Sequence, residues 1–240
     1  MGRLAVIGGH GILGTAFAAD ASRVEIETSY GPVSLLDATD WVVIQRHGLD
    51  EFVSAPYINH RAHVRALADL GCDHLLGLAS VGSLRRDLPL GTFVAPDDFI
   101  ALHLGISFSH GDHGHQSPGF DPTWRRTVAG CWAERSDVPL HDGGVYWQTI
   151  GPRFETRAEI RLIAGYADLV GMTIATECVL ARELGLAYAS ICVVDNLANG
   201  IGDAPLTMEK FRAGAAANRA RLVRALDAVL PALSKEAGSA

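Results

Sequence analysis

The chain has 240 residues, 48% of them hydrophobic and 20% charged, which is ordinary for a folded protein and leaves room for one large α/β domain. Its formal net charge of −7 argues against a general binder of nucleic acid or of anionic membranes, because such proteins carry basic surfaces. No apolar run approaches the roughly 18 residues of a membrane span, and the cysteines lack C-x-x-C spacing, which favours reduced thiols and a cytoplasmic protein.

Short apolar runs bounded by turn residues predict buried strands. In chain order they cover residues 4–9, 24–31, 34–39, 41–48, 74–83, 92–102, 143–151, 167–173 and 188–196. Helical patterns fall between them at 59–71, 156–166 and 175–185, and a long alanine-rich helix is expected at 206–235. Residues 105–121 are expected to form a long loop.

Strands that alternate with helices and are apolar along nearly their whole length are typical of a largely parallel sheet covered on both faces. The sequence therefore predicts a single α/β domain over residues 1–235, followed by a short polar tail at 236–240. Its central sheet is expected to be mixed but largely parallel, with helices on both sides.

Polar or glycine-rich clusters follow several predicted strands: GGHG (8–11), RHG (46–48), SVGS (80–83), GMT (171–173) and DN (195–196). Ligands of such folds bind at the carboxyl ends of the strands, so these clusters are expected to form one site. Glycines around His10 let backbone N–H groups approach an anion, and Arg46 with His47 adds donors that match phosphate oxygens. Taken singly, Arg46 and His47 are better explained by a surface salt bridge and a capping histidine, and a plain tight turn is the alternative for GGHG.

Further side chains suited to ligands recur at element ends: Phe154, Glu155, Met172, Thr173, Glu177, Asp195 and Asn196. An aromatic face beside a carboxylate suits a heterocyclic ligand, although a glutamate at a helix N-terminus is also favoured by the helix dipole. The spacing of His110, His113 and His115 matches no standard zinc site and no cysteine lies nearby, so no metal is expected there.

Together these motifs resemble the trimeric purine nucleoside phosphorylase and methylthioadenosine phosphorylase family, from Leu4 to about Arg224. The most specific segments are GPRFETRAEIR (151–161) and VGMTIATECVLARELGLAYASICVV (170–194). IGGHG, RHG, INHRAHVRAL, LASVGSLR and GTFVAPDDFI follow in the family's order. The resemblance implies a pentosyltransferase in which phosphate displaces a purine from C1′ of a nucleoside, giving free purine and a pentose 1-phosphate.

The resemblance also assigns roles to single residues. Phosphate would be held by Gly9, His10, Arg46, His47, Ser80 and Thr173; the base by Val81, Gly82, Phe154, Glu155 and Asn196; the ribose by Met172 and Met208; and the catalytic groups would be Asn196, Glu155 and Asp195. It implies no cofactor apart from inorganic phosphate as co-substrate, and no metal. It further implies a homotrimer, or a trimer-based oligomer, in which a neighbouring subunit completes the 5′ side of the ribose pocket.

Two positions bear on the substrate. An amide at Asn196 can donate to O6 of a 6-oxopurine and accept from N7, whereas a protonated aspartate suits a 6-aminopurine. Asp195 is adjacent, so a shift of one residue reverses this preference. Met208 stands where bacterial members that act on 6-oxopurines often carry a histidine for the 5′-hydroxyl, and its thioether suits a methylthio or 5′-deoxy group. The pair resembles the methylthioinosine phosphorylase branch; ordinary 6-oxopurine nucleosides are the next substrates it implies, and methylthioadenosine phosphorylase is the alternative.

The chain also departs from the family. His10 stands where Ser or Thr is usual, Glu51 where His is frequent, and Ala79 where methylthioadenosine enzymes often have Thr. A carboxylate beside a phosphate site is unfavourable unless it turns away, and a protonated His10 could compensate for it. These changes motivate a nucleoside hydrolase on the same scaffold as a second hypothesis. A non-catalytic purine-binding protein is the third.

Overall fold

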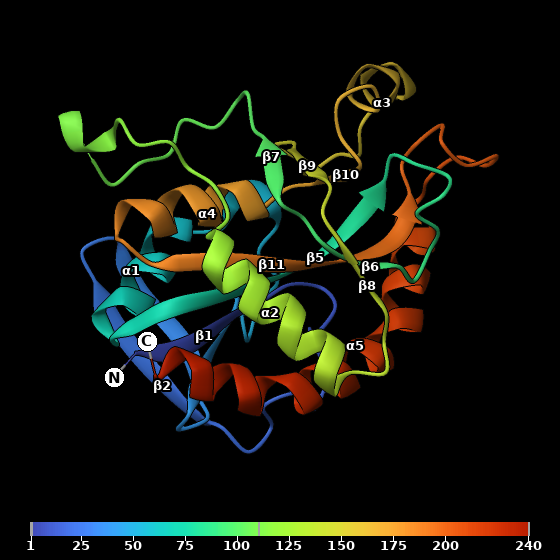
Figure 1. The fold of residues 1–240 in the computed structure, drawn as a ribbon. Helices are drawn as coiled ribbons and strands as arrows, with labels where there is room; N and C mark the ends of the chain where they lie inside the picture. Colours follow the sequence, from blue (N-terminus) through green and yellow to red (C-terminus); the bar gives the residue numbers. More distant parts are fainter. Residues whose placement is uncertain (1, 110, 240) are drawn as a thin grey trace.

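The computed structural model describes residues 2–109 and 111–239, and within them the strands form one eleven-stranded mixed sheet (Figure 1). The strands are β1 (Arg3–Gly8), β2 (Ser22–Thr28), β3 (Gly31–Asp37), β4 (Trp41–Gln45), β5 (Cys72–Ser83), β6 (Phe93–Ala95), β7 (Asp98–Ile100), β8 (Leu140–Asp142), β9 (Val145–Gln148), β10 (Leu169–Gly171) and β11 (Ala187–Leu197). The helices are α1 (His60–Asp69), α2 (Pro122–Arg135), α3 (Arg157–Ile163), α4 (Ile174–Glu183) and α5 (Met208–Ala237), with short 3-10 turns η1 (Ala55–Tyr57) and η2 (Asp112–Gly114).

Strand β5 lies at the centre of this sheet. β1 and β11 both pair with it in parallel, and β4 extends the parallel part beyond β1. The β2–β3 hairpin adds antiparallel strands at one edge, while β10 pairs antiparallel with the last residues of β5. The expected α/β fold, with a mixed and largely parallel sheet between helices, is confirmed.

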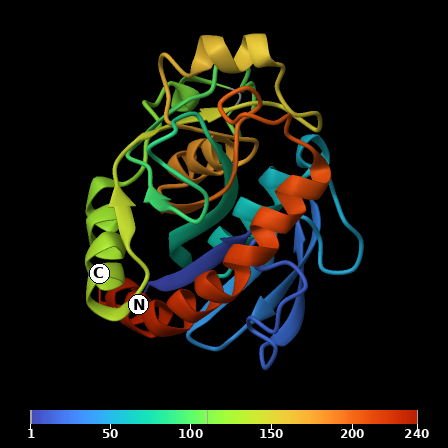
Figure 2. The ribbon, with the colours of Figure 1, turned by 90° about the vertical axis from the view of Figure 1, so that its right-hand side faces the viewer.

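Helices cover both faces of the sheet. Along β1, Ala5 and Ile7 join the core under α1 and α4, whereas Leu4 and Val6 join the core under α2 and α5. This follows from strand geometry, because successive side chains point to opposite faces. Figure 2 shows α5 running across the lower side of the molecule, with α3 at the opposite end. Burial on both faces explains why β1, β4 and β11 are apolar nearly throughout, whereas β2 at the edge of the sheet is largely exposed and charged.

Helix α2 is absent from the elements that the sequence patterns predict. It buries only Trp124, Val128 and Trp132, so its apolar stripe is narrow. Its start is nevertheless marked, because the Asp121 carboxylate accepts from the backbone N–H groups of Thr123 and Trp124, and a proline follows at the first helical position. The Asp-Pro pair is the signal that could have found it.

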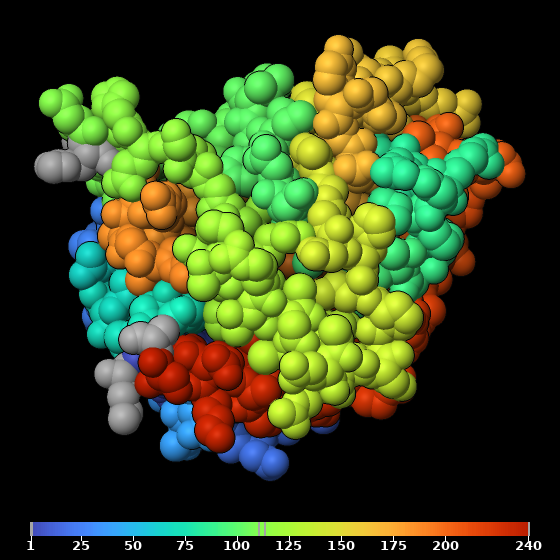
Figure 3. Space-filling model, in the orientation of Figure 1, coloured from blue at the N-terminus to red at the C-terminus, as the bar shows by residue number. Residues whose placement is uncertain are grey.

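Several boundaries differ from the expected ones, and β8 lies outside every predicted strand. The strand predicted at 92–102 is split into β6, which pairs with β11 and β8, and β7, which pairs with β9. Helix α5 continues to Ala237, which is fully buried, so the first two residues of the predicted polar tail belong to the helix. The predicted loop at 105–121 carries only η2 and extends away from the body at the upper left of Figure 3; His110 lies outside the described residues.

Over the described parts of the chain, no helix has the length and apolar character needed to cross a membrane. No cluster of three His, Cys, Asp or Glu side chains able to hold a metal ion occurs among those same residues.

Candidate active site

A cavity at the carboxyl ends of β1, β4, β5 and β11 brings together segments that are far apart in the sequence. Every residue to which the sequence analysis gave a role lines it, except Asp195: Gly9, His10, Arg46, His47, Ser80, Val81, Gly82, Phe154, Glu155, Met172, Thr173, Asn196 and Met208. The rule that ligands bind at the carboxyl ends of the strands therefore predicted the location of the cavity correctly.

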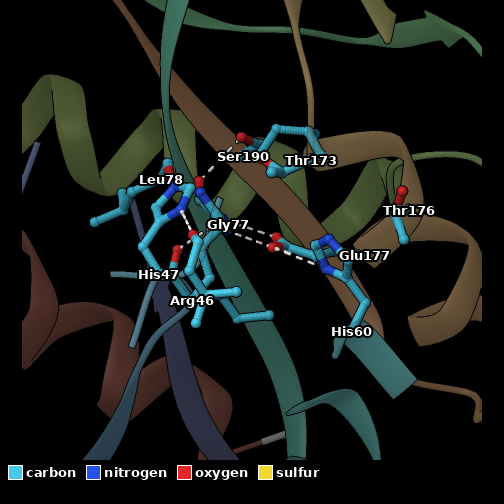
Figure 4. A network of polar contacts seen from close by, with 12 residues as sticks. Arg46, His47, His60, Gly77, Leu78, Thr173, Thr176, Glu177 and Ser190 are labelled. Atoms are coloured by element: carbon cyan, nitrogen blue, oxygen red, sulfur yellow. Dashed lines mark hydrogen bonds and ion pairs between the residues drawn. The ribbon is translucent and has the colours of Figure 1, made fainter. Parts of the chain in front are cut away.

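Arg46 is buried at the end of β4 and holds a fixed position (Figure 4). Its Nε and Nη2 donate to the two carboxylate oxygens of Glu177 at 2.6 and 2.9 Å. Nη2 also donates to the Ile7 carbonyl at 3.0 Å, and Nη1 to the Leu78 carbonyl at 2.5 Å. A guanidinium has five N–H groups, so these bonds leave one, on Nη1. Nη1 lies beside Gly9, because a β-carbon built there would be 2.7 Å from it.

Two histidines lie next to this arginine. The rings of His10 and His47 are 4.4 Å apart, and His10 also contacts Phe52 and Phe211. Burial, reinforced by the charge of Arg46, lowers the pKa of His10 to about 4. Burial likewise lowers the pKa of His47 to about 3. Both rings are therefore neutral near pH 7, so the free protein does not contain the protonated His10 considered above.

The tautomer of neutral His47 follows from its hydrogen bond. Its Nδ1 lies 2.8 Å from the Val53 carbonyl oxygen, which can only accept, so Nδ1 carries the proton. Nε2 then has a free lone pair. In this state His47 offers an acceptor to a ligand, and it becomes a donor only when the ring takes up a proton.

Thr173 is the N-cap of α4, and its backbone N–H and its side chain differ in their hydrogen bonding. Its backbone N–H donates to the Tyr146 hydroxyl at 3.1 Å, and its side chain makes no capping bond. The backbone N–H of Thr173 is therefore already bound within the protein. The hydroxyl is the group that remains available at the cavity.

The other end of the cavity combines a carboxylate with an amide. The Glu155 carboxylate accepts from the Thr149 hydroxyl at 2.6 Å, and its main-chain oxygen accepts from Asn199 at 3.2 Å. Asn196, near the end of β11, donates one N–H to the Leu197 carbonyl at 3.1 Å, which leaves its oxygen and its second N–H for other partners. Both side chains are more than nine-tenths buried, so their positions are well defined.

Asp195 is the one proposed catalytic residue that lies elsewhere. It is 1% exposed and points towards α5, where its carboxylate accepts from Asn218 at 2.8 Å. Helix α5 packs tightly against it, since a β-carbon on Gly214 would be 1.8 Å from the Asp195 carbonyl oxygen. Asn196 lines the cavity, whereas the Asp195 carboxylate is bound to Asn218 of α5, so Asn196, and not Asp195, faces the cavity; the register of β11 is irregular between Val194 and Asn196. The choice between Asp195 and Asn196 as the residue that faces the cavity is therefore decided in favour of Asn196.

Several lining residues were not singled out from the sequence. They are mainly apolar and lie after β4, before α3, in β10, just after β11 and around the start of α5: Phe52, Ser54, Ala55, Pro152, Val170, Ala198, Leu206 and Phe211. No local pattern distinguishes them from core or surface residues. Glu51, which raised a concern about charge, is exposed and does not line the cavity.

The model of the Phosphorylase superfamily matches residues 4–231. The chain belongs to this family. Among its phosphorylase superfamily relatives, the probable 6-oxopurine nucleoside phosphorylase of Archaeoglobus fulgidus is 40% identical over 202 residues, which cover 82% of this chain and 83% of that protein. A probable S-methyl-5′-thioinosine phosphorylase of Xylella fastidiosa is 37% identical, covering 85% and 92%.

Solved structures of the superfamily share the whole fold. A methylthioadenosine phosphorylase sourced from an antarctic soil metagenomic library has a TM-score of 0.83 at 25% identity, covering 98% of this chain and 87% of that one. The methylthioadenosine phosphorylase of Schistosoma mansoni in complex with adenine has a TM-score of 0.79 at 24% identity, covering 100% and 97%. At 24% identity, the likeness to the Schistosoma mansoni structure shows a shared fold and nothing more.

Proposed function

We propose that this chain is a pentosyltransferase that cleaves purine nucleosides with inorganic phosphate, releasing free purine and a pentose 1-phosphate. One observation supports this most strongly: a single cavity has an end suited to an anion at Gly9, Arg46 and Thr173, and an end suited to a base at Glu155 and Asn196. The names of the superfamily relatives agree with this chemistry. No other cofactor is required.

The two ends divide the work of the reaction. As the glycosidic bond breaks, positive charge builds on the ribose and negative charge on the purine. Phosphate held by the Gly9 loop, Ser80, the free Nη1 hydrogen of Arg46 and the Thr173 hydroxyl would lie below C1′. Asn196 and Glu155 would stabilise the charge that develops on the base. Positioning and fixed dipoles then supply the catalysis, and no protein nucleophile takes part.

The base pocket favours 6-oxopurines. Asn196 faces the cavity with an oxygen and one N–H available, so it can accept from N7 and donate to O6. Its neighbours Val170 and Ala198 are apolar and add no side-chain acceptor for a 6-amino group beyond those of Asn196 and Glu155. The relative with 40% identity is named for 6-oxopurines, which supports the same preference.

The 5′ side of the cavity favours an apolar substituent. Met208 lines it together with Leu206, Phe52 and Phe211, and none of these side chains can bond a 5′-hydroxyl. A methylthio or 5′-deoxy group would bury its apolar surface there at no polar cost. Methylthioinosine is therefore the preferred substrate, ahead of inosine, with methylthioadenosine third.

We also propose that the chain forms a homotrimer in the cytoplasm. Among the described residues, five large apolar side chains are 60% exposed or more, and three of these are Tyr57, Leu102 and Ile150. These three belong to segments around a second cavity that lies beside the first and shares Ala55 and Met172 with it. Exposed apolar surface of this kind marks subunit contacts. A neighbouring subunit there would complete the 5′ side, and light scattering after size exclusion would measure the trimer's mass.

Base release in the presence and absence of phosphate tests the proposed reaction. Purified protein is incubated with inosine, methylthioinosine, adenosine and methylthioadenosine, and free base is measured. Release that requires phosphate and is fastest for methylthioinosine is the expected result. Release without phosphate would favour the hydrolase. One of the two substitutions that suggested a hydrolase, Glu51, lies outside the cavity. Tight binding of purine without turnover would favour the binding protein.

A further inference from the structure

Below the anion-binding end of the cavity, Glu177 forms a buried ion pair with Arg46 that the proposed reaction does not use directly (Figure 4). Both side chains are 1% exposed, and Glu177 does not line the cavity. Burying two charges is costly, so their retention at this place calls for a reason beyond stability. The geometry of the pair supplies such a reason.

The ion pair fixes the orientation of the guanidinium. Glu177 takes both Nε and Nη2 of Arg46, which is the edge that an arginine normally uses to bind an anion bidentately. The carbonyls of Ile7 and Leu78 bind the guanidinium as well. Arg46 is thus prevented from turning its fork towards the cavity, and it presents a single N–H of Nη1 beside Gly9.

Glu177 is itself held from several sides. The Tyr188 hydroxyl donates to its Oε2 at 2.6 Å, and Nδ1 of His60 lies 3.7 Å from its Oε1. Burial keeps the pKa of His60 well below its usual value, so this ring adds no charge to the group. Tyr188 cannot move towards β5, because a β-carbon on Gly77 would be 1.9 Å from its hydroxyl.

The pair also connects the two sides of the anion-binding end. Arg46 follows β4, and Glu177 lies in the first turns of α4, whose N-cap is Thr173. The carboxylate therefore sets the place of the Arg46 N–H relative to the Thr173 hydroxyl. A site whose donors are fixed before the ligand arrives loses less freedom on binding.

We propose that Glu177 is a positioning residue for phosphate, which holds Arg46 so that one N–H of Nη1 faces the Gly9 loop beside the Thr173 hydroxyl. This inference rests on the proposed function. Removing the carboxylate has two opposite effects on phosphate binding, so the direction of the measured change shows which effect is larger. Loss of its negative charge would strengthen phosphate binding, whereas loss of the fixed geometry would weaken it. Positioning is the larger effect.

The Glu177→Gln variant tests this proposal. A glutamine amide can accept from Arg46 with one atom only, so the fork is broken while the size of the side chain is kept. We expect the KM for phosphate to rise about 10- to 100-fold, the loss typical of one charge-assisted hydrogen bond. The KM for the nucleoside should stay within about twofold, because that end of the cavity is untouched. A phosphate KM that is unchanged or lower in the folded variant would overturn the proposal.

Two further variants guard the test against a folding defect. Tyr188→Phe removes only the hydrogen bond to Glu177, and should raise the phosphate KM in the same direction by a smaller factor. If Glu177→Gln does not fold, an unchanged phosphate KM in Tyr188→Phe overturns the proposal instead. Ser190→Ala is the control, because it deletes a buried bond to the Gly77 carbonyl without touching Arg46 or Glu177, and both KM values should stay the same. Wild-type protein that shows no phosphate-dependent turnover would refute the proposed function itself.

Discussion

Replacing Gly9 by alanine tests where the anion binds. The added β-carbon would lie 2.7 Å from Nη1 of Arg46 and 2.9 Å from the Leu78 carbonyl oxygen, closer than such atoms pack. Arg46 is unable to retreat, because Glu177 and two carbonyls hold it in place. The backbone of Gly9 is outside the left-handed region, so alanine adds no conformational strain of its own. The methyl group would therefore take the place of a phosphate oxygen.

The size of the effect follows from the contact that is lost. A hydrogen bond to a charged group contributes about 1.5–3 kcal/mol, and about 1.4 kcal/mol corresponds to a factor of ten in affinity. Gly9→Ala should therefore raise the KM for phosphate by roughly 10- to 150-fold. The KM for the nucleoside should change by less than about twofold, because the base lies at the other end of the cavity.

Steady-state kinetics with phosphate and nucleoside varied in turn would measure both constants. Gly130→Ala in α2 is the matched control, since a β-carbon there meets nothing within 4 Å and the variant should behave as wild type. Circular dichroism would show that Gly9→Ala is folded. An unchanged phosphate KM in the folded variant would refute the placement of the anion beside Gly9 and Arg46.

Three further predictions concern the base, the 5′ group and pH. Asn196→Asp should lower the ratio of kcat/KM for inosine to that for adenosine by about 100-fold, because a protonated carboxyl donates to N7 and accepts from a 6-amino group; an unchanged ratio would remove Asn196 from base recognition. Met208→His should shift the ratio of kcat/KM from methylthioinosine towards inosine by about tenfold, through a new bond to the 5′-hydroxyl, and a ratio that stays constant would place the 5′ group elsewhere. Burial lowers the pKa of His47 from 6.5 to about 3, so the unfolded chain binds more protons below pH 6.5 and stability falls as the pH drops from there. At pH 4.5 His47 alone should lower the free energy of unfolding, measured with urea, by about 2–3 kcal/mol relative to neutral pH. His47→Asn should make the free energy of unfolding less dependent on pH.

Local sequence patterns predicted much of the fold and the place of the site. Apolar runs predicted most of the strands, and the rule for carboxyl ends of strands placed Gly9, Arg46 and Asn196 in one cavity. Cap residues such as Thr156 and Asn59 began helices where the periodicity indicated. These features depend on interactions between near neighbours in the chain, which is why the sequence reveals them.

What the sequence did not reveal depends on contacts between distant segments. Arg46 and Glu177 are 131 residues apart, and nothing in either motif says that the arginine's fork is already occupied. The neutral state of His10 results from its burial among side chains that include Phe52 and Phe211, which come from two other parts of the chain. The opposite orientations of Asp195 and Asn196 likewise required the position of α5.

The most direct test of the proposed function is the balance of atoms in the reaction. Purified protein is incubated with methylthioinosine and phosphate in water enriched in ¹⁸O, and purine, phosphate and sugar products are measured by mass spectrometry. Phosphorolysis predicts one phosphate consumed and one pentose 1-phosphate formed for each purine released, with no ¹⁸O from water in the sugar. A free pentose that carries ¹⁸O, with phosphate left unconsumed, would contradict it.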